Sequence, residues 1–253
     1  MNDAELLALA ARLARSAAAA ILSVRDAGFS VERKEDFSPV TAADRLADAI
    51  ITEGLREAAP DIPVVGEEAV SDGAELSAAP RYWLVDPLDG TREFAAGRAE
   101  FTVNIGLIEN GRPKLGAVAL PATDELFTGI VGQGAWKEDA AGHRPIACRA
   151  VPAEGLVVMA SRHYKDDPKL PAFLEGRRVQ RIVQIGSAVK FCRLAEGVAD
   201  LYPRFGRTME WDTAAPEAVL VAAGGRCTHF DGSPLGYGKP GWENQPFLCQ
   251  GRA

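Results

Sequence analysis

The hydrophobic period of the chain changes twice, and this order of patterns limits which folds it can adopt. Apolar residues recur at helical spacing within residues 3–27 and again in 41–60, which predicts two amphipathic helices. Residues 62–131 then follow the pattern of consecutive short strands. After Pro152, strand patterns alternate with helical ones. We therefore predict an α+β first half and an α/β second half, with a boundary near residue 150.

Individual elements follow from the same patterns. Strands are predicted at 62–66, 81–85, 101–108, 114–120, 125–131, 156–160, 179–185 and 201–202. A helix is predicted over 186–197, and a last helix begins after Asp212. The stretch 132–144 is rich in glycine and polar residues, which favours surface turns.

Charge and cysteine content exclude some classes of function. The chain has 28 basic and 35 acidic side chains, a net charge of −7, which disfavours binding to nucleic acid polymers. An anionic substrate would need local positive charge from a metal ion or from a few basic residues. The four cysteines form no CxxC pair, so a zinc site is disfavoured and reduced thiols in a cytoplasmic protein are expected. The first helix carries acidic residues before its apolar ones, unlike a signal peptide, and we expect no integral membrane segment.

Two aspartates directly follow a predicted apolar strand, in the sequence Asp86-Pro87-Leu88-Asp89-Gly90-Thr91. Carboxylates this close repel each other unless a cation lies between them. Magnesium prefers such hard oxygen ligands and retains positions for water and phosphate. A solvated turn is the alternative interpretation, because Asp, Pro and Gly are also common turn residues.

Further acidic residues occur where strands end or helices begin. Glu67 and Glu68 follow a short strand, Asp44 lies in the first turn of the second helix, and Asp212 precedes the last helix. Each has a structural explanation, as a solvated loop residue, a partner of the helix dipole or an N-cap. Together they indicate a ligand site, because open α/β sheets bind ligands at such positions.

Four ordered motifs give the chain a resemblance to the inositol monophosphatase superfamily. They are Lys34-x-Asp36-x-Ser38-Pro39-Val40-Thr41-x-x-Asp44, Gly66-Glu67-Glu68, Trp83 to Phe94, and Trp211-Asp212-Thr213-Ala214-Ala215. The resemblance covers nearly the whole chain. It implies a layered αβαβα sandwich of the inositol monophosphatase and fructose-1,6-bisphosphatase type. It also implies a first half (1–150) that binds metal and phosphate and a second half (151–253) that completes the metal site and selects the substrate.

Within the superfamily, the chain is most similar to the CysQ-type bacterial 3′(2′),5′-bisphosphate nucleotidases. The similar segments are Asp89 to Phe94, Glu100 to Ile105 and Tyr202-Pro203-Arg204. This branch implies a Mg²⁺-dependent, lithium-sensitive phosphomonoesterase of sulfur metabolism that hydrolyses adenosine 3′,5′-bisphosphate to AMP and phosphate. A sugar or polyol phosphatase of the inositol monophosphatase type is the first alternative, and a non-catalytic nucleotide sensor is the second.

The resemblance also implies roles for individual residues. Glu67, Asp86 and the Leu88 carbonyl would hold one Mg²⁺, and Asp86, Asp89 and Asp212 a second. A third ion would lie near Glu67 and Glu68. The Gly90 and Thr91 amides would bind the phosphate, while Asp44 and Thr91 would orient and deprotonate the attacking water.

In the second half, Ser187 and Lys190 resemble the family's Gly-Ser-x-x-Lys segment and are expected to meet the nucleotide or its 5′-phosphate. Arg204 and His163 are further candidates for substrate binding. A phosphorylated small molecule, a nucleoside bisphosphate, is thus the expected partner. A homodimer and peripheral association with the inner face of the membrane are left open.

Overall fold

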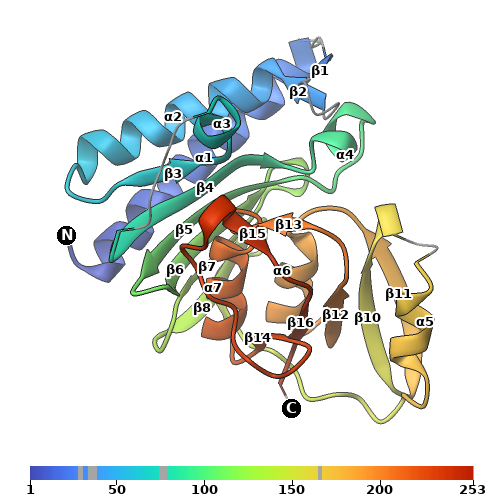
Figure 1. The fold of residues 1–253 in the computed structure, drawn as a ribbon. Helices are drawn as coiled ribbons and strands as arrows, with labels where there is room; N and C mark the ends of the chain where they lie inside the picture. The colour runs from blue at the N-terminus through green and yellow to red at the C-terminus, as the bar shows by residue number, and fades with distance from the viewer. Residues whose placement is uncertain (28–30, 34–38, 74–78, 165–166, 253) are drawn as a thin grey trace.

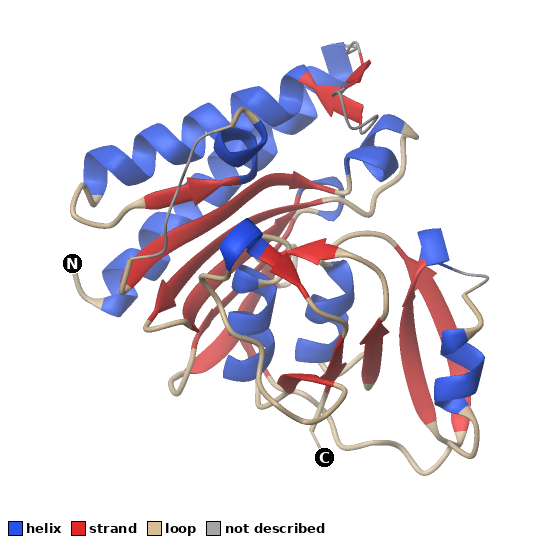
Figure 2. Cartoon of the chain, in the orientation of Figure 1, coloured by secondary structure: helices blue, strands red, loops and turns tan. Residues whose placement is uncertain are grey.

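The computed structural model describes residues 1–27, 31–33, 39–73, 79–164 and 167–252. These residues form five layers in the order helix, sheet, helix, sheet, helix (Figures 1 and 2). Three apolar cores fill the spaces between successive layers. The predicted αβαβα sandwich is therefore confirmed.

Two long helices, α1 (Asp3–Ala27) and α2 (Ala42–Ala58), form the first layer. A reciprocal capping box begins α1, since the Asn2 side chain accepts from the Glu5 N–H and the Glu5 carboxylate accepts from the Asn2 N–H. By length and composition α1 could cross a membrane. It buries Leu6, Leu9 and Leu13 against the first sheet and α2, as a core helix does.

The first sheet has seven strands in the order β3-β4-β5-β6-β7-β8-β9. They are β3 (Val64–Gly66), β4 (Arg81–Asp89), β5 (Thr102–Glu109), β6 (Arg112–Leu120), β7 (Glu125–Ile130), β8 (Gly134–Asp139) and β9 (Gly142–Ile146). Only β3 and β4 are parallel, and every other neighbouring pair in this sheet is antiparallel. Every residue of β5 except the last is buried, because helices cover both faces of the sheet.

The middle layer consists of α6 (Val189–Ala195) and α7 (Ala214–Ala222). Three glycines in register, Gly106, Gly116 and Gly129, cross β5, β6 and β7 beneath α7. A Cβ on Gly116 would lie 2.3 Å from the Ala215 carbonyl oxygen, and one on Gly106 would lie 2.6 Å from the Ala215 nitrogen. The helix therefore rests directly on the backbone of the sheet.

The second sheet has five strands in the order β11-β10-β12-β16-β14, with α5 (Lys169–Leu174) on its outer side. Its strands are β10 (Leu156–Ser161), β11 (Val179–Ile185), β12 (Leu201–Arg204), β14 (Arg226–His229) and β16 (Phe247–Gln250). The short elements are β1 (Val31–Arg33), β2 (Pro39–Thr41), α3 (Glu67–Ser71), α4 (Thr91–Ala95), β13 (Thr208–Met209) and β15 (Glu243–Asn244), with 3₁₀ turns at Pro121–Thr123, Arg162–Tyr164 and Pro240–Trp242.

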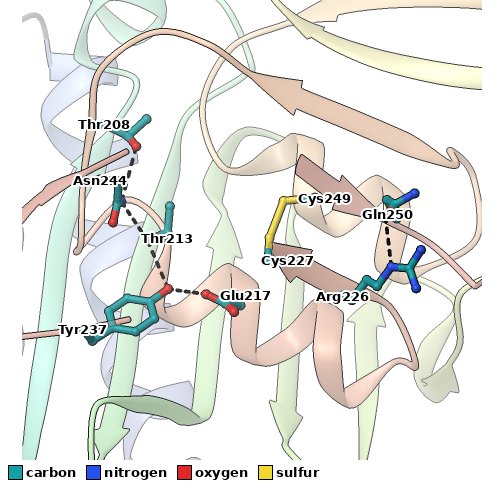
Figure 3. The surroundings of a disulfide bond; sticks show 9 residues. All are labelled: Thr208, Thr213, Glu217, Arg226, Cys227, Tyr237, Asn244, Cys249 and Gln250. Atoms are coloured by element: carbon teal, nitrogen blue, oxygen red, sulfur yellow. Dashed lines mark hydrogen bonds between the residues drawn. A yellow bond between two sulfur atoms is a disulfide. The ribbon is translucent and has the colours of Figure 1, made fainter. Parts of the chain in front are cut away.

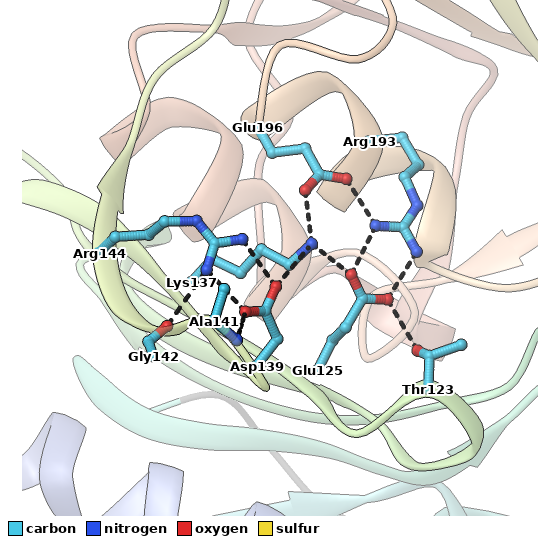
Figure 4. Close-up of polar contacts among 9 residues, drawn as sticks. All are labelled: Thr123, Glu125, Lys137, Asp139, Ala141, Gly142, Arg144, Arg193 and Glu196. Carbon is cyan, nitrogen blue, oxygen red and sulfur yellow. Dashed lines mark hydrogen bonds and ion pairs between the residues drawn. The ribbon is translucent and has the colours of Figure 1, made fainter.

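A cluster of ion pairs fixes α6 to the first sheet (Figure 4). Lys137 of β8 contacts Glu125 of β7, and its Nζ lies 2.7 Å from Oε2 of Glu196, just after α6. Arg193 of α6 in turn contacts Glu125 at 2.7 Å. Removing one member would leave a poorly solvated charge, which typically costs about 3–5 kcal/mol.

Two predictions from the sequence are wrong. The stretch 132–144 does not form surface turns: it contains β8 and the start of β9. The pattern was obscured because Lys137, paired in the ion cluster, occupies a buried position of β8. Cys227 and Cys249 are not reduced thiols but a disulfide, because they face each other in register across antiparallel β14 and β16 (Figure 3).

The division near residue 150 stays a prediction. The first sheet ends at residue 146 and the second begins at residue 156. However, α7 comes from the second half and packs on the first sheet, and one apolar core contains residues from both halves.

Candidate active site

A bulge at the end of β4 brings Asp86 and Asp89 to the same face of the sheet. Asp86 pairs with Asn104 of β5, and Asp89 pairs with Thr102, so two residues of β4 lie opposite Val103. On a regular strand, residues three apart point to opposite faces, and one extra residue restores the shared face. The Asp86 carboxylate also accepts the Leu88 N–H at 3.1 Å, within the bulge.

Asp89 is fixed from two directions. Its Oδ2 accepts the Ala188 N–H at 2.5 Å, from the segment that leads into α6. The same oxygen accepts the Thr102 hydroxyl at 3.3 Å, from β5. Among the described residues, both of these hydrogen bonds go to the same carboxylate oxygen.

The remaining predicted carboxylates come from three helix starts. Glu67 is the first residue of α3 and follows β3, the parallel neighbour of β4. Asp44 lies in the first turn of α2 and is buried. Asp212 precedes α7 but does not cap it, since its Oδ2 accepts the Met209 N–H at 2.9 Å. All three predicted placements at element ends are thus confirmed.

The pKa shifts of these acids indicate that they are buried close enough for their charges to repel one another. Burial raises the pKa of Asp86 well above its usual value, and the charges of Glu67 and Asp89 raise it further. Burial also raises the pKa of Asp212, as do the Asp89 and Glu67 charges. Burial raises the pKa of Asp89, although Lys190 opposes this effect. A cation among these carboxylates would lower their pKa values and relieve their repulsion.

The donor set fits a hard divalent metal ion, because it consists of carboxylates from four separate elements. Within the described part of the chain, no three His, Cys, Asp or Glu side chains are already close enough to hold one ion. The acids therefore form a repelling cluster rather than a closed cage.

A cavity of about 290 Å³ opens beside the cluster, between the end of β4 and the second sheet. Eight residues predicted from the sequence line it: Asp89, Gly90, Thr91, His163, Ser187, Lys190, Arg204 and Asp212. Gly90 has a left-handed backbone (φ 91°), and a Cβ there would lie 2.9 Å from the Glu100 carbonyl oxygen. Asp44, Glu67, Asp86 and Leu88 lie outside the cavity lining, and the charges of Glu67 and Asp44 act on Asp86.

Lys190 is the buried cation of this cavity. Its ammonium group donates to the Ser187 carbonyl and lies 5.2 Å from the Tyr202 ring centroid. Burial lowers the pKa of Lys190 to about 8, although the Asp89 charge opposes that shift. Ser187 itself has φ 48°, and its hydroxyl accepts the Val189 N–H at 3.3 Å.

The other two basic candidates line the cavity near its opening. His163 places Nε2 2.8 Å from Oε1 of Glu93, a buried carboxylate of α4. Arg204 donates from Nη2 to the Arg207 carbonyl at 2.7 Å. Both residues line the cavity, and their role in binding a substrate stays a prediction.

A buried hydrogen-bond network surrounds Thr213, the residue after Asp212 (Figure 3). The Tyr237 hydroxyl donates to Glu217 of α7 and lies 3.1 Å from the Thr213 hydroxyl, which also accepts from Asn244. Burial raises the pKa of Glu217 to about 7. These contacts hold the start of α7 next to Asp212, and Thr213 itself lines the cavity.

Some residues of the site were not predicted. Thr102 and Asn104 contact or face the two aspartates of β4, but the sequence assigned them only to a strand and to the branch-like segment Glu100 to Ile105, with no role in the site. Their signal is available in the sequence, as polar residues at alternate positions of an otherwise apolar strand. The motif residues 34–38, from Lys34 to Ser38, lie outside the described residues.

Comparisons with known proteins agree with this geometry. Residues 2–249 match the family model described as the inositol monophosphatase family. The 3′(2′),5′-bisphosphate nucleotidase CysQ of Salmonella typhimurium is 46% identical over 228 residues, which cover 89% of this chain and 91% of the relative. The crystal structure of CysQ from Bacteroides thetaiotaomicron superimposes with a TM-score of 0.82 at 32% identity, covering 98% of each chain. An inositol monophosphatase structure from Anabaena gives a TM-score of 0.79 at 27% identity, covering 100% of this chain and 92% of the other.

Proposed function

The chain belongs to the inositol monophosphatase family, and we propose that it is a metal-dependent 3′(2′),5′-bisphosphate nucleotidase. The observation that carries this function is the 46% identity to a nucleotidase of that name over nearly the whole of both chains. The site supports it, since a cluster of carboxylates adjoins a cavity that contains Lys190 and Arg204. The substrate we propose is adenosine 3′,5′-bisphosphate, and the products are AMP and phosphate.

Magnesium is the metal that we propose for the carboxylate cluster, with two ions and a third, weaker one. Glu67, Asp86 and the Leu88 carbonyl would hold the first ion, and Asp86, Asp89 and Asp212 the second. Glu67 and Glu68 would hold the third. The bound ions would supply charge neutralisation for the phosphate and its leaving oxygen and a lowered pKa for the attacking water.

The protein itself supplies orientation. Gly90 and Thr91 would donate backbone N–H groups to the phosphate, and the left-handed Gly90 that leads into α4 supports this role. We assign to Asp44 and Thr91 the orientation of the attacking water and acceptance of its proton. Ser187, Lys190, Arg204 and His163 would bind the second phosphate and the nucleoside.

Release of phosphate from a panel of substrates tests this proposal. With Mg²⁺ present, adenosine 3′,5′-bisphosphate is expected to be hydrolysed much faster than inositol 1-phosphate or a sugar phosphate. Equal rates would favour a sugar or polyol phosphatase, which shares the same carboxylates. Binding of the bisphosphate without turnover would favour a nucleotide sensor.

We further propose that the enzyme acts in the cytoplasm, within sulfur metabolism. Its negative net charge supports the absence of a nucleic acid partner. A homodimer and peripheral association with the inner face of the membrane belong to the same proposal. Sedimentation and cell fractionation test these two statements.

A further inference from the structure

The side-chain amide of Asn104 is buried and has no hydrogen-bond partner among the described residues. Its side chain is fully buried in β5, and among the described residues neither Oδ1 nor Nδ2 has a hydrogen-bond partner. An unpaired buried polar group destabilises the folded state, because it loses its hydrogen bonds to water without replacing them. Native proteins retain such groups rarely, so each of them requires an explanation.

The position of Asn104 supplies that explanation. It lies directly opposite Asp86 in the antiparallel ladder, where side chains share one face of the sheet. Two residues before it, Thr102 donates to Asp89. Two residues after it, Gly106 lies under Ala214 and Ala215, at the start of α7. Thus β5 forms the floor of the carboxylate cluster, and Asn104 is the middle residue of that floor.

We infer that Asn104 is a positioning residue that orients the Asp86 carboxylate for metal binding. An amide is both a donor and an acceptor, so Nδ2 can donate to a carboxylate oxygen of Asp86 without adding charge. Outer partners of this kind typically change metal affinity about 10- to 100-fold when they are lost. This inference rests on the proposed metal-dependent function and adds a residue to it.

Replacement of Asn104 by leucine, which has a similar size and no polar atoms, tests the inference. The protein without metal should melt at the same temperature or higher, because two unpaired polar atoms are removed. Calorimetric titration with Mg²⁺ should show an affinity lower by about 10- to 100-fold. A merely structural role would give the opposite pair of results, a lower melting temperature with unchanged Mg²⁺ affinity.

Two further variants keep the test decisive. Asn104→Ser retains a smaller hydrogen-bonding group and should have an intermediate affinity, and it replaces the leucine variant if that protein does not fold. Thr128→Val, in β7, removes a buried polar group away from the acids and should leave Mg²⁺ affinity unchanged.

The outcomes also separate this inference from the proposed function. If the wild-type protein binds no Mg²⁺, the proposed metal is wrong. If the wild type binds Mg²⁺ and Asn104→Leu binds it equally well, only the role of Asn104 is overturned.

Discussion

The Asp89 carboxylate, at the end of β4, accepts a hydrogen bond of 2.5 Å from the backbone N–H of Ala188, 99 residues later in the chain. This contact joins the carboxylate cluster of the first sheet to the segment that begins α6. Since Ser187 and Lys190 flank the same N–H, this contact would couple the proposed metal site to the proposed substrate site. A shift of this segment would move a proposed metal ligand.

Asp89→Asn should abolish turnover but leave the fold intact. Asparagine retains an oxygen for the Ala188 and Thr102 donors, and it removes one charge from a repelling cluster. The loss in kcat/KM should be on the order of 100-fold or more, since even outer partners of a metal contribute about 10- to 100-fold. Steady-state kinetics and thermal unfolding measure the two effects. Near-normal activity would contradict the metal assignment.

Lys190→Met should weaken binding of the substrate's second phosphate. Loss of a charged hydrogen bond typically costs about 1.5–3 kcal/mol, which corresponds to roughly 10- to 100-fold in KM. The effect should be large for adenosine 3′,5′-bisphosphate and small for adenosine 3′-monophosphate, which lacks the 5′-phosphate. Arg181→Met, an exposed change in β11, is the matched control. Equal effects on both substrates would remove Lys190 from 5′-phosphate recognition.

Glu217→Gln should change how stability depends on pH. The folded-state pKa of Glu217 is about 7, above its ordinary value of 4.5, so the folded chain holds this proton more tightly than the unfolded chain. Its stabilising contribution is therefore full below about pH 4.5 and is lost as pH rises through 7. The variant should gain on the wild type by up to about 3 kcal/mol between pH 5 and pH 8. Urea unfolding at several pH values measures this gain, and Glu57→Gln, an exposed change in α2, should show none.

Gly116→Ala should impair the site from a distance. The new methyl group would lie 2.3 Å from the Ala215 carbonyl oxygen, so α7 must move away from the sheet. Such overpacking typically costs about 1–3 kcal/mol of stability. Because Asp212 precedes α7, Mg²⁺ affinity should fall as well. Gly132→Ala, at a glycine with no atoms near its Cβ position, should leave metal affinity unchanged.

Millimolar lithium should inhibit turnover, because Li⁺ is a small, hard cation that suits carboxylate ligands but carries only one charge. Phosphate release measured against Li⁺ concentration, with Na⁺ as the control, tests this expectation. Insensitivity to lithium would count against the proposed second metal position.

Much of the architecture could be predicted from the sequence because its strands have strong local patterns. The strands that contain Trp83, Ile105 and Val118 are rich in apolar residues, and all three lie in the first sheet. The β8–β9 hairpin was not predicted, since the charge on the buried Lys137 is compensated by Asp139 and by the sequence-distant Glu125 and Glu196.

The acidic residues of the site were predicted from their positions at the ends of elements. The hydrogen bonds that hold these residues in place were not predicted. Ala188 donates through its backbone, which no side-chain pattern reveals. The Cys227–Cys249 disulfide depends on strand register in the second sheet, and spacing along the chain does not encode it. Register and backbone donors are tertiary properties, and they account for most of what the sequence did not reveal.

The bulge in β4 sets how far apart along the chain two acids can be and still share a face. Residues two apart share a face on any regular strand, and the extra residue opposite Val103 gives Asp86 and Asp89, which are three apart, the same relationship. A variant that lost the bulge but kept every residue would turn Asp89 away from Asp86, toward the core that contains Trp83 and Val85.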